Sequence, residues 1–405
     1  MLVLRCAWRN LWRNSRRTAI TLAAVSLNTA ILIASYSLMD GLWWRTISNA
    51  TNMVVGEAQI HAPKYLARRS IYESLPAPEG ILRALKKSNI PAAPRSYGYG
   101  LMAHGTKSAG ALLWGVDPDA ERAAFDLAAH VAVGRFLGQR PQQGVVLGKK
   151  LARSLNAVAG SEIVVVVQGA DGSLGNELFF VTGILKSAGD SIDRNAAIMH
   201  RTDFADLFVS KGRVHEIALN TKGASTLDGL AALAAQAAPE AEVKTWRQLL
   251  PALSDMVNML DVGIGIFGII FFMAAGLGVM NTMLMATFER TREFGIIKAL
   301  GAGPWRILRD VAAEALVLGL VSTVLGLLLG LAGSYYLQVV GLDTSFIAGD
   351  VTVAGVAFDP LWRAMISFKT VALPVAAMWV VCLAAAIYPA ALAARLDPVR
   401  AIYRV

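Results

Sequence analysis

The sequence predicts a membrane protein with four transmembrane α-helices and a large extracytoplasmic α+β domain inserted between spans 1 and 2. Its 405 residues are 55% hydrophobic and only 17% charged, whereas soluble domains are about 45–50% apolar and about a quarter charged. The 38 basic and 29 acidic residues are nevertheless too many for a chain that lies entirely in a membrane. Membrane spans combined with a water-exposed domain account for both observations.

Four apolar stretches reach the length of about 20 residues that a helix needs to cross a hydrocarbon core of about 30 Å. They are residues 18–40, 262–288, 311–340 and 371–394. The third stretch contains one ionisable residue, Glu314, which is either functional or paired with Arg309 or Arg306 at the membrane interface; we expect the pairing. Gly326 and Gly330 form a GxxxG motif in the same stretch, which predicts close helix packing.

The distribution of charge predicts the topology. The short segments 1–17, 289–310 and 395–405 together hold 13 basic and four acidic residues, whereas the long segment 41–261 holds 23 and 20. Since short cytoplasmic segments carry the basic excess, we expect both termini and segment 289–310 in the cytoplasm. Residues 41–261 and the loop 341–370 should lie outside. The excess charge is therefore a topology signal and does not indicate nucleic-acid binding.

Residues 1–17 predict an amphipathic elbow helix on the cytoplasmic side. Four arginines share one face and four apolar residues share another: Arg5, Arg9, Arg13 and Arg16, and Leu4, Trp8, Leu11 and Trp12. Such a helix lies among the lipid headgroups. It either positions the first span or serves as a topology anchor, and both roles are compatible. The first span is too long for the apolar region of a signal peptide, so we expect an anchor.

The outer segment 41–261 predicts an α+β domain on helical stalks. Expected strands are residues 53–61, 215–220 and 242–245, together with a hairpin of 162–167 and 178–185. Expected helices are 79–89, 226–237 and 202–208, the last with Thr202 as its N-cap, and 144–156 predicts a strand, a turn and a helix. From Trp246 the helical pattern continues into span 2 without a break, and span 1 extends outward through Ile47.

Signatures of catalysis are absent from the sequence. There is no GxxxxGK[ST] phosphate loop, no HExxH and no GxSxG, and the two cysteines and five scattered histidines form no pattern of a metal or nucleophile site. We therefore expect a non-catalytic subunit with no catalytic residues, no metal and no cofactor of its own.

The segment between spans 2 and 3, residues 289–302, predicts a short amphipathic helix. Phe294, Ile297 and Leu300 recur at every third position, and Gly301 with Pro304 ends the helix. Such a helix suits docking into a groove on another protein; the alternative is a loop lying on the lipid. The residues expected to couple to a partner are Glu289, Arg290, Glu293, Phe294, Gly295, Ile297, Lys298, Leu300 and Gly301.

This segment resembles the ER..EIG..KALGA signature of the MacB/FtsX/LolC–LolE permease family of ABC transporters. Residues 388–401 resemble the YPA..AAR.DPV.AL end of that family, and residues 10–17 resemble its N-terminal helix. The order of one span, a large outer domain and three further spans is also similar, so the resemblance covers essentially the whole chain. Phe294 stands where the family commonly has isoleucine, and Arg400 and Tyr403 also depart from its pattern.

The resemblance implies a permease of the bacterial inner membrane whose large domain is periplasmic. In that family the equivalent of residues 289–302 is a coupling helix that docks on a cytoplasmic ABC ATPase. Since no phosphate loop is present, we expect ATP and magnesium to be bound by a separate ATPase dimer. A second copy of the permease, or a homologous permease, would complete the complex. Coupling would be mechanical, with ATP-driven closure moving the periplasmic domain.

The family resemblance also suggests a substrate or dimer face along spans 1 and 2. The residues expected there are Leu38, Leu42, Met256, Val257, Leu260, Ile264 and Phe267, although ordinary packing explains each equally well. Similarity of layout to the LolC/LolE branch predicts handling of lipoproteins or another lipidic substrate at the outer leaflet. The alternatives are MacB-like efflux of a peptide, toxin or drug with periplasmic partners, and an FtsX-like signal relay without transport.

Overall fold

The computed structural model describes residues 2–344, 352–353, 356–357 and 361–402. Their chain forms two compact units. We call the described residues of Met1–Trp43, Val257–Ile347 and Pro360–Val405 the helical unit, and those of Trp44–Met256 and Ala348–Asp359 the sheet unit. Parts of the predicted loop 341–370 and tail 395–405 lie outside the described residues, namely 345–351, 354–355, 358–360 and 403–405.

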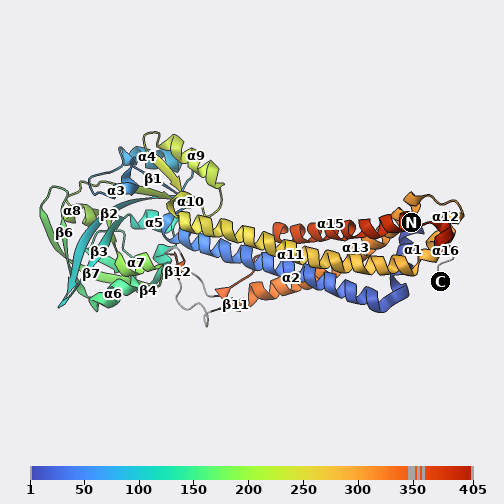
Figure 1. The fold of residues 1–405 in the computed structure, drawn as a ribbon. Coiled ribbons are helices and arrows are strands. Elements are labelled where there is room, and N and C mark those ends of the chain that lie inside the picture. Colours follow the sequence, from blue (N-terminus) through green and yellow to red (C-terminus); the bar gives the residue numbers. More distant parts are fainter. Residues whose placement is uncertain (1, 345–351, 354–355, 358–360, 403–405) are drawn as a thin grey trace. The chain divides into compact units, whose positions relative to one another are not determined.

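Four long helices dominate the elements shown in Figure 1. They are α2 (Ser15–Ala50), α11 (Pro251–Glu289), α13 (Pro304–Val339) and α15 (Phe368–Ala394). Within the described residues, these four are long and apolar enough to cross a membrane. Each contains one of the four apolar stretches of the sequence, apart from residue 340, which caps α13, so the prediction of four transmembrane helices is confirmed by length and composition.

The core of the helical unit draws on all four helices. Val25 of α2, Val279 of α11, Leu318 of α13 and Met378 of α15 are buried in one cluster. A Cβ added to Gly326 would lie 2.6 Å from the Cβ of Thr29. The GxxxG motif therefore lets α13 approach α2 closely, as its sequence predicts.

The N-terminal segment is not one continuous helix. Helix α1 (Leu2–Leu11) is followed by a 3₁₀ turn, η1 (Trp12–Asn14), and α2 then begins at Ser15. Trp8 and Trp12 are exposed and pack edge to face, with ring centroids 5.8 Å apart. Exposed tryptophans on a helix that enters a span are typical of a membrane interface.

The sheet unit is built on a ten-stranded mixed sheet with the order β10-β1-β9-β2-β3-β8-β5-β7-β4, in which β6 pairs with β2 and β7. Its strands are β1 (Ala58–His61), β2 (Ala92–His104), β3 (Lys107–Val116), β4 (Val131–Gly134), β5 (Gly144–Leu147), β6 (Glu162–Gln168), β7 (Leu174–Leu185), β8 (Ala196–His200), β9 (Glu216–Leu219) and β10 (Glu242–Thr245). Two short strand pairs lie elsewhere, β11 (Leu342–Asp343) with β14 (Leu361–Trp362), and β12 (Thr352–Val353) with β13 (Val356–Ala357).

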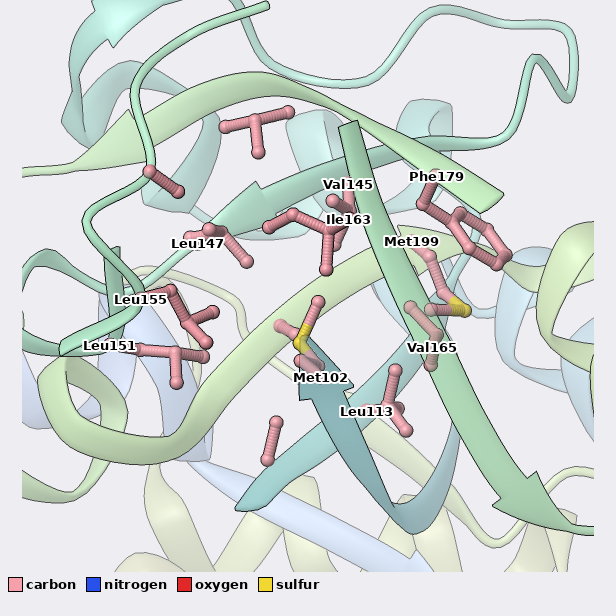
Figure 2. Packing of buried hydrophobic residues seen from close by; sticks show 14 of the residues in the cluster. Met102, Leu113, Val145, Leu147, Leu151, Leu155, Ile163, Val165, Phe179 and Met199 are labelled. Atoms are coloured by element: carbon pink, nitrogen blue, oxygen red, sulfur yellow. The ribbon is translucent and has the colours of Figure 1, made fainter. Parts of the chain in front are cut away.

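Short helices accompany this sheet. They are α3 (Tyr65–Arg68), α4 (Pro78–Lys87), α5 (Pro118–Ala124), α6 (Lys149–Leu155), α7 (Asp190–Asn195), α8 (Arg201–Leu207), α9 (Leu227–Ala237) and α10 (Trp246–Leu249), with a 3₁₀ turn, η3 (Leu127–His130). Figure 2 shows how residues of helix α6 such as Leu151 and Leu155 pack with strand residues such as Met102 and Ile163. Burial alternates along β6, as in a strand with one face on the core, although residues 163–167 form an unbroken apolar run in the sequence.

Several predicted elements are confirmed. Strands β6 and β7 pair antiparallel as a hairpin. Strand β5 and helix α6 follow each other across residues 144–156, as expected. The helix expected over residues 226–237 is α9; Thr226 caps it, and its hydroxyl accepts a hydrogen bond from the amide of Gly229 at 3.3 Å.

Three predictions for the sheet unit are wrong in detail. The strand expected over residues 53–61 covers only Ala58–His61, because Thr51–Val55 forms a π-helix, η2, that Gly56 ends with φ of 77°. The N-cap of α8 is His200 rather than Thr202, since the ring of His200 accepts a hydrogen bond from the Thr202 amide. The helix from Trp246 breaks at Leu250, because a residue that precedes a proline is disfavoured in the helical conformation.

Candidate functional site

The candidate coupling segment contains helix α12 (Thr291–Ala299), which connects α11 to α13. Glu289 is the last residue of α11, and Arg290 lies at the turn between the two helices. Past the end of α12, Gly301 adopts φ of 92°, and Pro304 begins α13. Glycine tolerates this left-handed conformation, so the glycine and the proline end the helix as the sequence predicts.

Phe294 turns inward rather than toward a partner. Its ring is buried in a cluster with Ile307 and Val311 of α13 and with Ala390 and Ala393 of α15. The expected exposed stripe of Phe294, Ile297 and Leu300 is therefore not a single accessible face. A phenylalanine can face a neighbouring helix as well as a partner, and periodicity alone does not distinguish the two.

The exposed residues of α12 and of its C-cap, Leu300, include a row of Arg292, Ile296 and Leu300. These residues are spaced by four positions, which places them on one side of a helix. Leu300 is 83% exposed, and the indole of Trp305 at the start of α13 is also exposed. Apolar side chains of this size, exposed on a short helix, are typical of a docking surface.

Glu293 and Glu289 hold α12 and the end of α11 to the N-terminal segment. The guanidinium of Arg13 donates to Glu293 at 2.6 Å, and that of Arg17 donates to Glu289 at 2.8 and 3.3 Å. Arg290 also donates to Glu293, at 3.0 Å. Partial burial raises the pKa of Glu293, but the hydrogen bonds from Arg13 and Arg290 outweigh it, and the pKa is lowered overall.

Glu314 pairs with Arg290, so the expected pairing with Arg309 or Arg306 is wrong. The guanidinium of Arg290 donates to the carboxylate of Glu314, which also accepts from the side-chain amide of Asn10 at 2.7 Å. On a helix with 3.6 residues per turn, Arg309 lies about 140° around α13 from Glu314, and Arg306 lies about two turns, or 12 Å, back along its axis. The true partner lies at the start of α12, where sequence spacing gives no indication of proximity.

Lys298 connects α12 to α15. Its ammonium donates to the carbonyl oxygens of Ala394 at 2.9 Å and Leu396 at 2.6 Å. The last carbonyls of a helix lack partners within the helix, and a cation there is favoured by the helix dipole. Helix α16 (Pro398–Ile402) also packs against α12.

We use the name ion-pair cluster for Asn10, Arg13, Arg17, Glu289, Arg290, Glu293 and Glu314. Its inner pair is protected from solvent, because the side chains of Arg290 and Glu314 are 14% and 6% exposed. Its outer pair is open to solvent, since those of Arg13 and Glu293 are 52% and 45% exposed. Together with Lys298, the cluster attaches α12 to the segments that begin α2 and α13 and to the segment that ends α15.

The residues expected to form a substrate or dimer face lie on two helices. Leu38 and Leu42 are on α2, and the other five, Met256, Val257, Leu260, Ile264 and Phe267, are on α11. Leu42 is buried and Phe267 is exposed, while the remaining five are partly exposed.

An exposed row of apolar side chains on α11 could not be identified from the sequence. Met259, Val262, Ile266, Ile270 and Met273 follow one another at spacings of three to four residues, and all five are exposed. This row was not apparent because α11 is apolar around its whole circumference, so the hydrophobic pattern does not select a face.

The histidines of the sheet unit are closer in space than in sequence. Tyr65 stacks on His61 and on His215, with ring centroids 5.8 and 5.6 Å apart. Sequence spacing alone gave no sign of this stack. Among the described residues, no group of three or more histidines, cysteines or acidic residues is arranged to hold a metal ion.

Two family profiles match the chain. That of the FtsX-like permease C-terminal region matches residues 265–398, and that of the MacB-like periplasmic core domain matches residues 18–244. The fold thus defines a multipass membrane protein with a large periplasmic MacB-like domain between its first and second spans. The chain belongs to the MacB/FtsX-type family of ABC transporter permeases.

Curated relatives agree with this assignment. An uncharacterised ABC transporter permease of Methanocaldococcus jannaschii is 26% identical over 206 residues, which are 49% of this chain and 50% of that protein. The macrolide export ATP-binding/permease protein MacB of Marinobacter nauticus is 24% identical, over 82% of this chain and 52% of its own. The pyoverdine export ATP-binding/permease protein PvdT of Pseudomonas syringae pv. tomato is 26% identical, over 98% and 59%. The chain thus spans between half and three fifths of their lengths.

Proposed function

We propose that this chain is the permease subunit of a transporter in the bacterial inner membrane, driven by an ATPase that is a separate chain and docks on α12 from the cytoplasm. Both termini are cytoplasmic in this proposal, and the sheet unit is periplasmic. The exposed row of Arg292, Ile296 and Leu300 on α12 carries the proposal. The ATPase binds ATP and magnesium.

The ion-pair cluster supports mechanical coupling. Helix α12 is continuous in sequence with α11 and α13, and Arg13, Arg17 and Lys298 attach it to the segments next to α2 and α15. A movement of α12 therefore acts on all four long helices at once. Because solvent weakens an exposed salt bridge, the pair of Arg290 and Glu314 is the attachment that solvent weakens least.

The lengths of α2 and α11 also support this mechanism. They contain 36 and 39 residues, which at 1.5 Å per residue gives about 54 and 58 Å of helix. A hydrocarbon core takes only about 30 Å. Each helix thus has enough length left to continue as a stalk into the periplasm, so that movement at the cytoplasmic end is transmitted along a rigid element.

For the cargo we favour export with periplasmic partners, since two relatives that match most of this chain are named for macrolide and pyoverdine export. Handling of lipoproteins or another lipidic substrate at the outer leaflet is the second candidate. Its support is the apolar surface of α11, where Phe267 and the row from Met259 to Met273 are suited to acyl chains. A second copy of this permease, or a homologous one, completes the complex in either case.

The docking proposal is tested by charge substitution on the exposed row. Leu300→Asp should leave the chain inserted in the membrane but reduce co-purification of the ATPase and stimulation of its hydrolysis by at least tenfold. Leu174→Asp is the matched control, because Leu174 of β7 is 78% exposed and lies in the sheet unit. Wild-type association and stimulation in the Leu300 variant would reject α12 as the docking helix.

The cargo proposal needs a separate experiment on the purified complex. Native mass spectrometry should find a periplasmic adaptor or an outer-membrane channel among the co-purifying subunits if the complex exports. A bound lipoprotein or acyl lipid would instead favour lipid handling. A bound periplasmic hydrolase with no transported species would favour an FtsX-like relay.

A further inference from the structure

A cavity of about 260 Å³ lies within the sheet unit. Its walls include residues of the π-helix η2, of α10 and of strands β2, β3 and β9. The volume is near the lower end of ordinary ligand pockets, which hold about 300–1,000 Å³. The cavity is therefore sized for a small molecule.

Four aromatic side chains line this cavity: Tyr65, Tyr97, Tyr99 and Trp114. Tyr65 is fixed between two histidine rings, and Tyr97 meets Trp114 edge to face with ring centroids 5.5 Å apart and planes at 83°. Rings held by such contacts lose little freedom when a ligand binds. The faces of aromatic rings attract organic cations.

The buried carboxylate of Glu216 also lines the cavity. It accepts hydrogen bonds from the phenol of Tyr97 at 3.0 Å and from Arg95 at 3.4 Å, and the ring of His61 lies 3.4 Å away. A carboxylate accepts about four hydrogen bonds, and two of these three contacts are long. Glu216 therefore retains the capacity to accept a further donor.

Arg95 does not neutralise Glu216 by itself. Its closest contacts to a carboxylate are with Glu121, at 2.6 and 3.1 Å, and all three side chains are buried. Its contact with Glu216 is longer, at 3.4 Å, so Glu216 is the less fully paired of the two carboxylates. Burial raises the pKa of Glu216, but the hydrogen bond and charge of His61, followed by the charge of Arg95, lower it below its ordinary value. Glu216 is thus anionic at neutral pH.

One donor at the cavity has no partner. The indole Nε1 of Trp114 is buried and makes no hydrogen bond to any described residue. A buried donor left unpaired is costly, so a ligand atom that accepts from it gains affinity. Arg69 lines the same cavity but is exposed, and water screens its charge.

We propose that this cavity binds a small organic ammonium compound with an apolar, preferably aromatic, body. The ammonium group donates to Glu216 and lies against the rings of Tyr97 and Tyr99, and a hydroxyl or carbonyl oxygen accepts from Trp114. This site is independent of the docking of an ATPase on α12.

The test uses three probes that share a phenol ring and differ in the charge of the side chain: tyramine, tyrosol and 4-hydroxyphenylacetate. Binding to the full chain in detergent is measured by isothermal titration calorimetry. We expect tyramine to bind at least tenfold more tightly than 4-hydroxyphenylacetate, with tyrosol between them. Equal affinities for the amine and the acid, or no binding of tyramine, would overturn the proposal.

Two variants assign the binding to this cavity. Tyr99→Ala removes a ring that is 65% exposed, so the fold should tolerate it, and tyramine should bind at least fivefold more weakly. Tyr72→Ala is its control, because Tyr72 is 58% exposed and does not line the cavity. Glu216→Gln should remove the preference for the amine over the alcohol. Unchanged tyramine affinity in the Tyr99 variant would contradict the assignment.

Discussion

The buried pair of Arg290 and Glu314 provides the sharpest test of how α12 is attached. Glu314→Gln keeps the shape of the side chain and removes its charge, which leaves the guanidinium of Arg290 with Glu293 as its remaining acidic partner. The side chains of Arg290 and Glu314 are mostly shielded from solvent. The substitution therefore leaves the mostly buried positive charge of Arg290 without the negative charge of Glu314.

Two known costs bracket the expected loss in the free energy of unfolding. Loss of one hydrogen bond to a charged group costs about 1.5–3 kcal/mol, and breaking a fully buried ion pair costs about 3–5 kcal/mol. Because Arg290 retains its bond to Glu293, we expect Glu314→Gln to lower the free energy of unfolding by about 3 kcal/mol. Arg13→Gln breaks a pair with a similarly short contact in solvent, and it should cost no more than about 1 kcal/mol.

Unfolding of the full chain by sodium dodecyl sulfate in mixed micelles measures both free energies. A double-mutant cycle with Arg290→Gln isolates the interaction energy of the pair. The loss of unfolding free energy in the double variant should be at least about 1.5 kcal/mol smaller than the sum of the losses in the two single variants. The reasoning would be refuted if Glu314→Gln and Arg13→Gln had equal effects, or if the cycle gave no coupling.

Two further perturbations follow from the same geometry. Gly326→Val should destabilise the helical unit, because an added Cβ would lie 2.6 Å from Thr29, whereas Gly333→Val should have little effect since nothing lies within 4 Å of that position; thermal unfolding in detergent compares the two. The folded state lowers the pKa of Glu293, so its contribution is present above the unfolded pKa of about 4.3 and is lost as pH falls below it. Glu293→Gln should therefore flatten the stability profile between about pH 5 and 3 by at most 1 kcal/mol, and an unchanged profile would contradict the ion pairs.

Much of the fold follows from local patterns in the sequence. The β-branched apolar run of β6 and the glycines between it and β7 specify a hairpin through strand propensity and turn chemistry, which act over a few residues. Thr226 marks the start of α9, because the contact of its side chain with the helix also acts over a few residues. The four spans are apparent because length and apolarity alone define them.

The remaining features depend on contacts between distant segments. Nothing near Glu314 in the sequence identifies Arg290 as its partner, because the pairing requires α13 to lie beside the start of α12. Phe294 fits an exposed or an inward position equally well until α15 covers it. The π-helix at Thr51–Val55 depends on Gly56, whose amide bonds to the carbonyl of Thr51, five residues back.

In the proposed mechanism α12 and the sheet unit lie on opposite sides of one membrane, so that a cytoplasmic ATPase can move a periplasmic domain. Labelling of single cysteines in spheroplasts with a membrane-impermeant maleimide tests it, using Leu300→Cys and Leu174→Cys in a chain in which Cys6 is replaced by serine. We expect position 174 to react in intact spheroplasts and position 300 to react only after they are permeabilised. Reaction of both positions from the same side would contradict the account.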